Sequence, residues 1–211
     1  MNASLRLVRF RAAVFAVVAL ALAACARAPE DIPRPTDRDI AALASAIRGL
    51  DPAVSTEEAA RAARIAYLHP LDLAVEYGIT DPPVLHNTKV NMGLRPRGLC
   101  WHWAEDMERR LAAEGFETLG LHRAISQPPL RLEHSTVIIS ARGDGMDEGL
   151  VLDPWRYGGK LYWSPVNADE RYDWEPRAVV LARRRPEGPL PGDEPRPATT
   201  GPAGGTHGVE L

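Results

Sequence analysis

The sequence contains little cysteine and none of the closely spaced residue pairs that commonly bind zinc. Its two cysteines, Cys25 and Cys100, lie far apart in a chain of 211 residues. No CxxC or HExxH pattern occurs, so a zinc site would need dispersed ligands. The candidate set is Cys100, His122, His134 and Asp153. Because close-spaced ligand pairs are absent, we expect no metal and no other cofactor.

Clustered basic residues, membrane-length hydrophobic runs and internal repeats are also missing. The apolar run Ala12–Leu22 is shorter than the ~20 residues that a membrane-spanning helix needs. The formal net charge is −3, and it becomes about −6 without residues 1–24, which hold three arginines and no acid. A mildly acidic chain without a basic stripe argues against nucleic acid as a partner.

The first 24 residues have the three parts of a secretion signal. Arg6, Arg9 and Arg11 form a positive region, an apolar run follows, and small residues precede Cys25. The stretch Leu22-Ala23-Ala24-Cys25 resembles the lipobox of bacterial lipoproteins, whose cysteine is acylated and becomes the first residue of the mature protein. The alternative is an ordinary signal peptide that happens to contain a cysteine.

The lipobox resemblance implies a protein held on the periplasmic side of a bacterial membrane by acyl chains on Cys25. The lipid bilayer is then the expected partner, and several chains are needed because one chain binds only marginally. Ala26 follows Cys25 where an aspartate would signal retention in the inner membrane, so the outer membrane is favoured. Cys100 is left unpaired in a compartment where cysteines are normally paired or absent.

Composition divides the rest of the chain into three parts. Residues 25–36 contain three prolines and are predicted to be the lipidated cysteine and an extended tether. Residues 37–185 have the size of one domain. Residues 186–211 are rich in proline and glycine with few apolar side chains, so we expect a disordered tail.

The first half of the domain is predicted to be helical. Thr36 with Asp39 and Ser55 with Glu58 match the capping-box pattern at helix starts. Apolar residues at helical spacing predict helices over 40–50, 59–68 and 71–77, while prolines and glycines predict a loop over 79–99.

A fourth, amphipathic helix is predicted to begin at Cys100. Cys100 shares one narrow stripe with Ala104 and Met107, whereas His102 and Asp106 lie opposite, on the face expected to meet solvent. The second half of the domain reads as strands over 118–125, 134–140, 150–153, 160–163 and 178–182. Helices followed by strands predict an α+β fold in which the helices, including the Cys100 helix, pack on an antiparallel sheet.

The hairpin of strands 134–140 and 150–153 brings His134 near Asp153. For residues that face each other across two antiparallel strands, the two residue numbers add up to a constant. The loop length places this sum near 287–290. In an odd-sum register the two side chains share a face and lie within ~8 Å. In an even-sum register they point to opposite faces. The sequence alone leaves both registers open.

Three residue types suited to nucleophilic catalysis therefore converge. Free backbone N–H groups at a helix start stabilise an anion such as a Cys100 thiolate. A histidine within reach can share the thiol proton, and an aspartate can fix the histidine tautomer. His122 is an alternative base, and Asn87, Asn91 or the Cys100 N–H are candidate oxyanion donors. Glu133 and Arg156 are expected to be surface charges.

The contexts of these residues resemble the core of the transglutaminase-like (papain-like) cysteine hydrolases. The similarity covers about residues 95–160 and rests on the motifs Gly98-Leu99-Cys100-Trp101, His134 and Leu152-Asp153-Pro154. It implies Cys100 as nucleophile, His134 as base and Asp153 as orienting acid. The chain departs from the family at Thr136, where an aromatic is usual, and at Trp155, where a small residue is usual.

These inferences predict a lipid-anchored cysteine-dependent amide hydrolase or acyl transferase that acts on peptides, with cell-wall peptides as candidates. Trp101 and Trp155, which flank Cys100 and Asp153, are the candidate substrate-binding aromatics. The alternative from another class is a non-catalytic binding or scaffold lipoprotein on the same fold, in which Cys100 is a buried packing residue.

Overall fold

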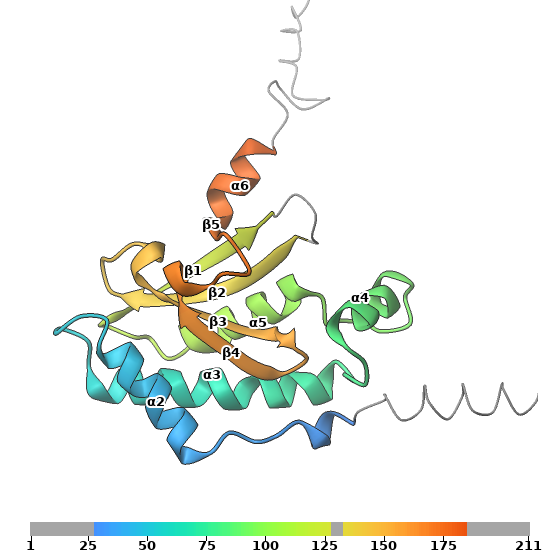
Figure 1. Cartoon of the computed structure of the whole chain (residues 1–211), viewed down its shortest axis with the longest axis horizontal. Helices are drawn as coiled ribbons and strands as arrows, with labels where there is room; N and C mark the ends of the chain where they lie inside the picture. Colours follow the sequence, from blue (N-terminus) through green and yellow to red (C-terminus); the bar gives the residue numbers. More distant parts are fainter. Residues whose placement is uncertain (1–27, 128–132, 185–211) are drawn as a thin grey trace, which may run out of the picture.

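The computed structural model describes residues 28–127 and 133–184 (Figure 1). The predicted signal over 1–24, the lipidation site Cys25 and the predicted tail over 186–211 lie outside the described residues. The first described segment is a single 3-10 turn, η1 (Pro29–Asp31).

The predicted α+β class is confirmed, with helices followed by an antiparallel sheet. The helices are α2 (Asp37–Arg48), α3 (Thr56–Glu76), α4 (Pro83–Asn91), α5 (Cys100–Ala112) and α6 (Arg177–Arg183). The strands are β1 (Leu119–Ser126), β2 (His134–Ala141), β3 (Leu150–Tyr157), β4 (Lys160–Pro165) and β5 (Glu175–Pro176), arranged in the order β4-β3-β2-β1-β5. Two further 3-10 turns are η2 (Met146–Glu148) and η3 (Val166–Ala168).

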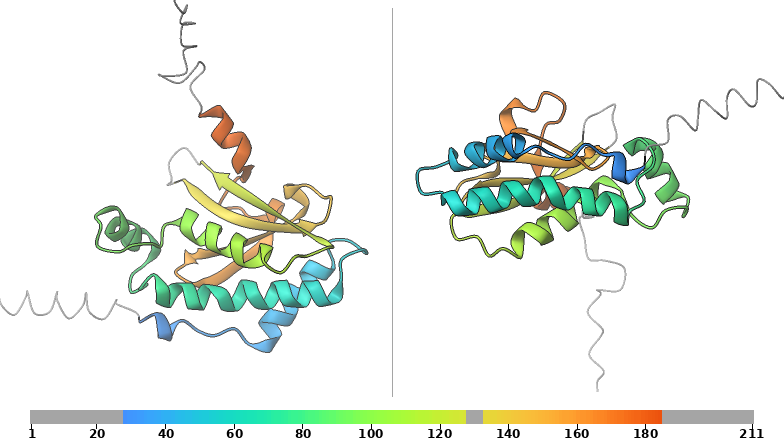
Figure 2. Two further views of the ribbon diagram at one scale, coloured as in Figure 1. Left: turned by 180° about the vertical axis from the view of Figure 1, so that it is seen from behind. Right: turned by 90° about the horizontal axis from the view of Figure 1, so that it is seen from below.

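Different parts of the chain cover the two faces of the sheet. On one face α3 and α5 pack side by side, and Met107 and Leu111 of α5 join Val137 and Leu152 in the main core (Figure 2). On the other face no α-helix residue belongs to the described core cluster. Ile138 and Val151 instead pack against Met146 of η2 and against the segment after β4, which supplies Tyr172 and Trp174. His134 lies on this second face, because it alternates with Ser135 and shares the side of Ile138.

The predicted helix caps have different outcomes. At α2 the capping box forms as predicted, because the Thr36 hydroxyl accepts from the Asp39 N–H and the Asp39 carboxylate accepts from the Thr36 N–H. At α3 only half of it forms. The Ser55 hydroxyl accepts from the Glu58 N–H, but the Glu58 carboxylate accepts from the backbone N–H groups of Glu117 and Thr118 at 2.8 and 2.9 Å.

Replacing Glu58 with glutamine should lower the free energy of unfolding by about 1–2 kcal/mol, because an amide nitrogen would face a backbone donor. These hydrogen bonds hold the Glu58 pKa below its usual range despite burial, which opposes them. The stabilisation by the Glu58 carboxylate is therefore fully present at pH values above its pKa in the unfolded chain. It is lost as the pH falls through the lower pKa that Glu58 has in the folded protein. Urea unfolding from pH 7 to pH 3 measures this. Exposed Glu57→Gln is the control, and an equal effect of both variants would contradict the role of Glu58.

Two helix predictions are wrong. The separate helices predicted over 59–68 and 71–77 are one helix, α3, which contains Pro70 and runs for 21 residues. The predicted loop over 79–99 contains α4, which begins at Pro83, where the fixed φ of proline suits a first helical turn. None of the helices in the described ranges is long and apolar enough to cross a membrane.

The strand predicted over 178–182 is also wrong, because this segment forms α6. The apolar run over 178–182 is too short for its periodicity to separate a strand from a helix. Its alanine and leucine residues, with an arginine at each end, favour the helix. Part of the predicted tether also differs from an extended chain. Ile32 is buried against Leu73, Tyr77 and Trp155, so the described part of the tether is attached to the domain.

Candidate active site

The hairpin of β2 and β3 adopts the odd-sum register. Val137 pairs with Leu152 and Ile138 with Val151, so His134 and Asp153 lie diagonally on the same face. The His134 Nε2 and the Asp153 Oδ2 are 2.6 Å apart, and each side chain is only 1% exposed. Of the two registers that the sequence leaves open, the structure has the one that brings these two residues together.

The charges of this pair stabilise one another. Burial lowers the pKa of the His134 imidazole, but the charge of Asp153, its hydrogen bond and the nearby Cys100 outweigh burial and raise the pKa to about 9. For Asp153, burial raises the pKa, but the charges and hydrogen bonds of His134 and Arg156 hold it below the usual range. At neutral pH the pair is therefore an imidazolium and a carboxylate.

Cys100 is the first residue of α5 and lies where β2 begins. Its half-buried side chain has Sγ 3.8 Å from the Glu133 carbonyl oxygen, next to His134 in the chain. Nε2 of His134 is bound to Asp153, and its buried Nδ1 has no conventional hydrogen-bond partner among the described residues. The Cys100 sulfur also lies near enough to raise the His134 pKa, so the side chains of Cys100, His134 and Asp153 lie together.

Three aromatic rings surround the His134 ring. The ring centroids of Trp155 and Tyr172 lie 4.6 Å from that of His134, and Trp174 lies at 5.4 Å. Trp155 is buried, and its Nε1–H donates to the Asn87 Oδ1 at 3.1 Å. The ring of Trp155 thus packs on that of His134, and the substrate-binding role of Trp155 stays a prediction. Trp101, in contrast, follows Cys100 and is 47% exposed, open to a bound molecule.

Arg156 is buried, which corrects the prediction of a surface charge. Its Nε–H donates to the Asp153 Oδ2 at 3.0 Å, and its two terminal nitrogens donate to both oxygens of Asp169 at 3.1 and 2.7 Å. The Asp169 Oδ2 also accepts from the Trp174 Nε1–H. The result is a buried row of alternating charges, in which each charged side chain lies next to one of opposite sign. Its members, in order, are His134, Asp153, Arg156 and Asp169. Glu133, as predicted, is exposed.

The loop before Cys100 is held by two histidines. Gly98 has φ of +123°, and a Cβ placed on it would lie 2.3 Å from the Nε2 of His86. This Nε2 is itself 2.9 Å from the Arg97 carbonyl oxygen. From the other side, the His102 Nδ1 accepts from the N–H groups of Gly98 and Leu99 at 3.1 and 3.2 Å.

His102 and Asp106 were expected on the solvent face of the Cys100 helix, and both are buried. Burial and the charge of Arg97 lower the His102 pKa, which keeps the neutral ring an acceptor for the loop. Asp106 accepts from the Tyr77 hydroxyl and forms ion pairs with Arg97 and Arg109. The amphipathic pattern misplaced them because most of their partners, among them Tyr77, Arg97 and Gly98, come from outside α5.

The remaining candidates lie elsewhere. The alternative base His122 is 2.8 Å from the Ser140 hydroxyl and pairs with Ile138, four residues along β2 from His134. Within residues 28–127 and 133–184 there is no cluster of histidine, cysteine and acidic residues that could hold a metal ion. Of the candidate oxyanion donors, Asn87 is engaged with Trp155 and Asn91 is exposed.

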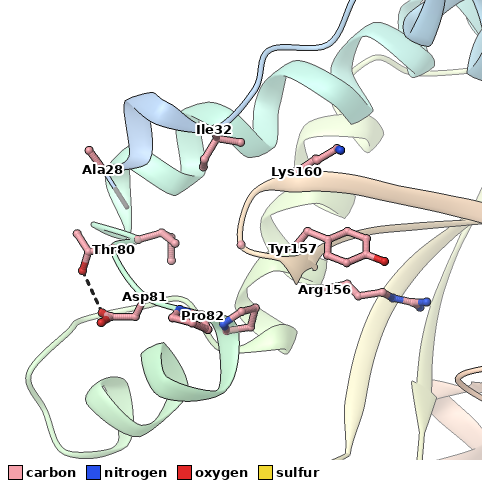
Figure 3. A pocket seen from close by; sticks show the side chains of 11 residues that line it. Ala28, Ile32, Thr80, Asp81, Pro82, Arg156, Tyr157 and Lys160 are labelled. Carbon is pink, nitrogen blue, oxygen red and sulfur yellow. Dashed lines mark hydrogen bonds between the residues drawn. The ribbon is translucent and has the colours of Figure 1, made fainter. Parts of the chain in front are cut away.

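A hollow of about 410 Å³ lies beside this site, between η1, the start of α4 and the turn between β3 and β4 (Figure 3). Ile32, Pro82 and Tyr157 line it, but Cys100, His134 and Asp153 do not. Figure 3 shows the Arg156 side chain leading away from Asp81 and Pro82, in keeping with its ion pairs inside the domain. The hollow is therefore not the place where a substrate would meet Cys100.

Comparison with family models, curated proteins and solved structures found no match to this chain.

Proposed function

We propose that this protein is a cysteine-dependent amide hydrolase or acyl transferase with Cys100 as nucleophile, His134 as acid and base, and Asp153 as the orienting residue. One observation carries the proposal. A buried imidazole is bound through Nε2 to a buried carboxylate, and its Nδ1 has no conventional hydrogen-bond partner among residues 28–127 and 133–184. The half-buried Cys100 thiol lies near enough to raise the pKa of this ring. Orphaned buried polar atoms are rare in folded proteins, and a catalytic role accounts for this one.

The chemistry follows from the protonation of this pair. With a pKa of about 9, His134 carries a proton on Nδ1 at neutral pH. The Cys100 thiolate attacks the amide carbonyl carbon, the C–N bond breaks, and Nδ1 gives its proton to the leaving nitrogen. Water or an amine then attacks the thioester and returns a proton to Nδ1. The acid or new amide leaves, and the Sγ is free again.

The resemblance to transglutaminase-like hydrolases supports this function. The order of a cysteine helix, a histidine strand and an aspartate strand agrees with that family, as does a cysteine-bearing helix packed on an antiparallel sheet. We assign the domain to this fold on that ground. Peptides are the substrate class that the chemistry fits, and cell-wall peptides are candidates because of the proposed location.

The proposed location is the periplasmic side of a bacterial membrane, with acyl chains on Cys25 as the anchor. The basic, apolar and small-residue parts of residues 1–24 and the Leu22-Ala23-Ala24-Cys25 stretch support it. The residue after Cys25 favours the outer membrane.

Alkylation of Cys100 tests the catalytic proposal. In the acylated full-length protein Cys100 is the free thiol, so iodoacetamide uptake reports on it alone. We expect rapid alkylation of the folded protein at neutral pH, because the charged His134 ring beside the sulfur favours attack by that sulfur as an anion. His134→Ala should slow this reaction about tenfold or more, and Asp153→Asn should slow it less. Mass spectrometry of timed samples measures each rate.

His122→Ala is the matched control, since it removes a histidine of the same sheet that lies away from Cys100. Its alkylation rate should equal that of the unchanged protein. If Cys100 reacts only when the protein unfolds, or if both histidine variants behave alike, the thiol is a packing residue. The protein is then better described as a non-catalytic binding or scaffold lipoprotein.

A further inference from the structure

Helix α4 and the residue that ends it expose several large apolar side chains to solvent. The side chains of Val84, Leu85 and Met92 are 56, 49 and 67% exposed. At 100° per residue these three lie within about 100° of arc on one face of the helix. His86, on the opposite face, is buried. Single exposed apolar residues are ordinary, but several gathered on one side of a helix indicate a surface with a partner.

The exposed face of α4 lies at the end of the molecule where the described chain begins. Pro82 and Pro83, at the start of α4, line the same hollow as Ala28 and Ile32 of the N-terminal segment (Figures 1 and 3). Cys25 precedes Ala28 by three residues, which span at most ~10 Å even when fully extended. A lipid on Cys25 would therefore enter a bilayer close to α4.

The segment that contains α4 also carries cations. Residues 83–98 contain Lys89, Arg95 and Arg97 and no acidic residue, although the chain as a whole has a formal charge of −3. Lys89 is paired with Asp81 and Arg97 with Glu105 and Asp106, whereas Arg95 has no ion pair among the described residues. Leu94, in the same stretch, is 61% exposed. Apolar side chains flanked by cations are the features by which surface helices bind anionic bilayers.

We propose that the exposed face of α4, with Val84, Leu85, Met92 and Leu94, docks on the bilayer that the acyl chains of Cys25 enter. This docking rests on the proposed lipid anchor. The anchor alone would let the domain rotate freely, whereas the added contact fixes its orientation. Because the opposite face of α4 holds Trp155 through Asn87, the docked orientation also fixes the active site relative to the membrane.

Depth-dependent fluorescence quenching tests the docking. The acylated full-length protein, with Cys100→Ser so that an introduced cysteine is the only free thiol, is placed in vesicles of phosphatidylethanolamine and phosphatidylglycerol. A nitrobenzoxadiazole label on Met92→Cys should be strongly quenched by lipids that carry a nitroxide near the headgroup. The same label on Asp147→Cys, an exposed position in η2 at the other end of the sheet, should be quenched severalfold less.

A matched pair of substitutions controls for indirect effects. Leu85→Asp should reduce quenching of the Met92→Cys label severalfold, whereas Val179→Asp, at a similarly exposed site on α6, should not. Vesicle-bound protein with both labels equally unquenched would overturn the docking and leave the anchor intact. Protein that carries no lipid and does not sediment with vesicles would overturn both. Protection of Met92→Cys that depends on protein concentration without vesicles would assign the face to a second copy and overturn the docking.

Discussion

Replacing Asp153 with alanine should lower the free energy of unfolding by about 3–5 kcal/mol, because breaking a buried ion pair leaves its partner uncompensated. Two buried cations depend on this carboxylate, since its Oδ2 accepts from both the His134 Nε2–H and the Arg156 Nε–H. His134 would revert to a neutral ring, so the Cys100 alkylation described above should also slow. Urea unfolding at pH 7 measures the first effect.

The controls separate charge from packing. Asp173→Ala removes an exposed carboxylate of the same segment of chain and should leave the unfolding midpoint unchanged. Asp153→Leu combined with Arg156→Met removes an anion and a cation together, and we expect it to recover part of the lost stability. An Asp153→Ala variant as stable as the unchanged protein would show that the row of buried charges does not support this fold.

Replacing Gly98 with alanine should cost about 3 kcal/mol of stability and displace Cys100. The glycine φ of +123° is unfavourable for alanine, and the added Cβ would lie 2.3 Å from the His86 Nε2, so strain and overpacking add. Because Gly98 also donates to His102 and precedes Cys100 by two residues, the thiol should lose its place beside His134. Thermal unfolding and the Cys100 alkylation rate are the two measurements.

Gly93 is the matched control for this substitution. It also has a positive φ, of +74°, but a Cβ there would meet nothing within 4 Å. Gly93→Ala should therefore cost only the backbone strain and leave alkylation unchanged. Adding His86→Ala to Gly98→Ala should restore part of the lost reactivity, because it removes the clash. If the single and double variants react equally slowly, the clash with His86 is not the cause.

Local signals predicted much of the architecture. The capping box at Thr36 set the start of α2, because it depends only on residues three apart in the sequence. The β2–β3 loop length limited the register to two classes, one of which places His134 against Asp153. These features depend on neighbouring residues, so the sequence carries them directly.

The unpredicted features depend on contacts between distant parts of the chain. Arg156 appeared to be a surface charge because its second partner, Asp169, is 13 residues away in an irregular segment. The one available signal was Asp153, three residues before Arg156, a spacing at which opposite charges on a strand end can meet. Helix α4 was not predicted because it lacks the usual apolar stripe toward the core, and its Val84 and Leu85 side chains face outward.

The surroundings of His134 set the shortest length at which this domain can work. The chain has supplied all three proposed catalytic residues, Cys100, His134 and Asp153, by the end of β3. A fragment that ends after β4 would therefore still contain them. Such a fragment would lack Asp169, the second anion beside Arg156, and the Tyr172 and Trp174 rings that cover His134. Without Asp169, Arg156 would compete with His134 for Asp153, and water would reach the His134 imidazole. The smallest fragment that keeps the proposed site intact therefore extends through β5, and in shorter expression fragments Cys100 should lose its fast alkylation or the protein should fail to fold.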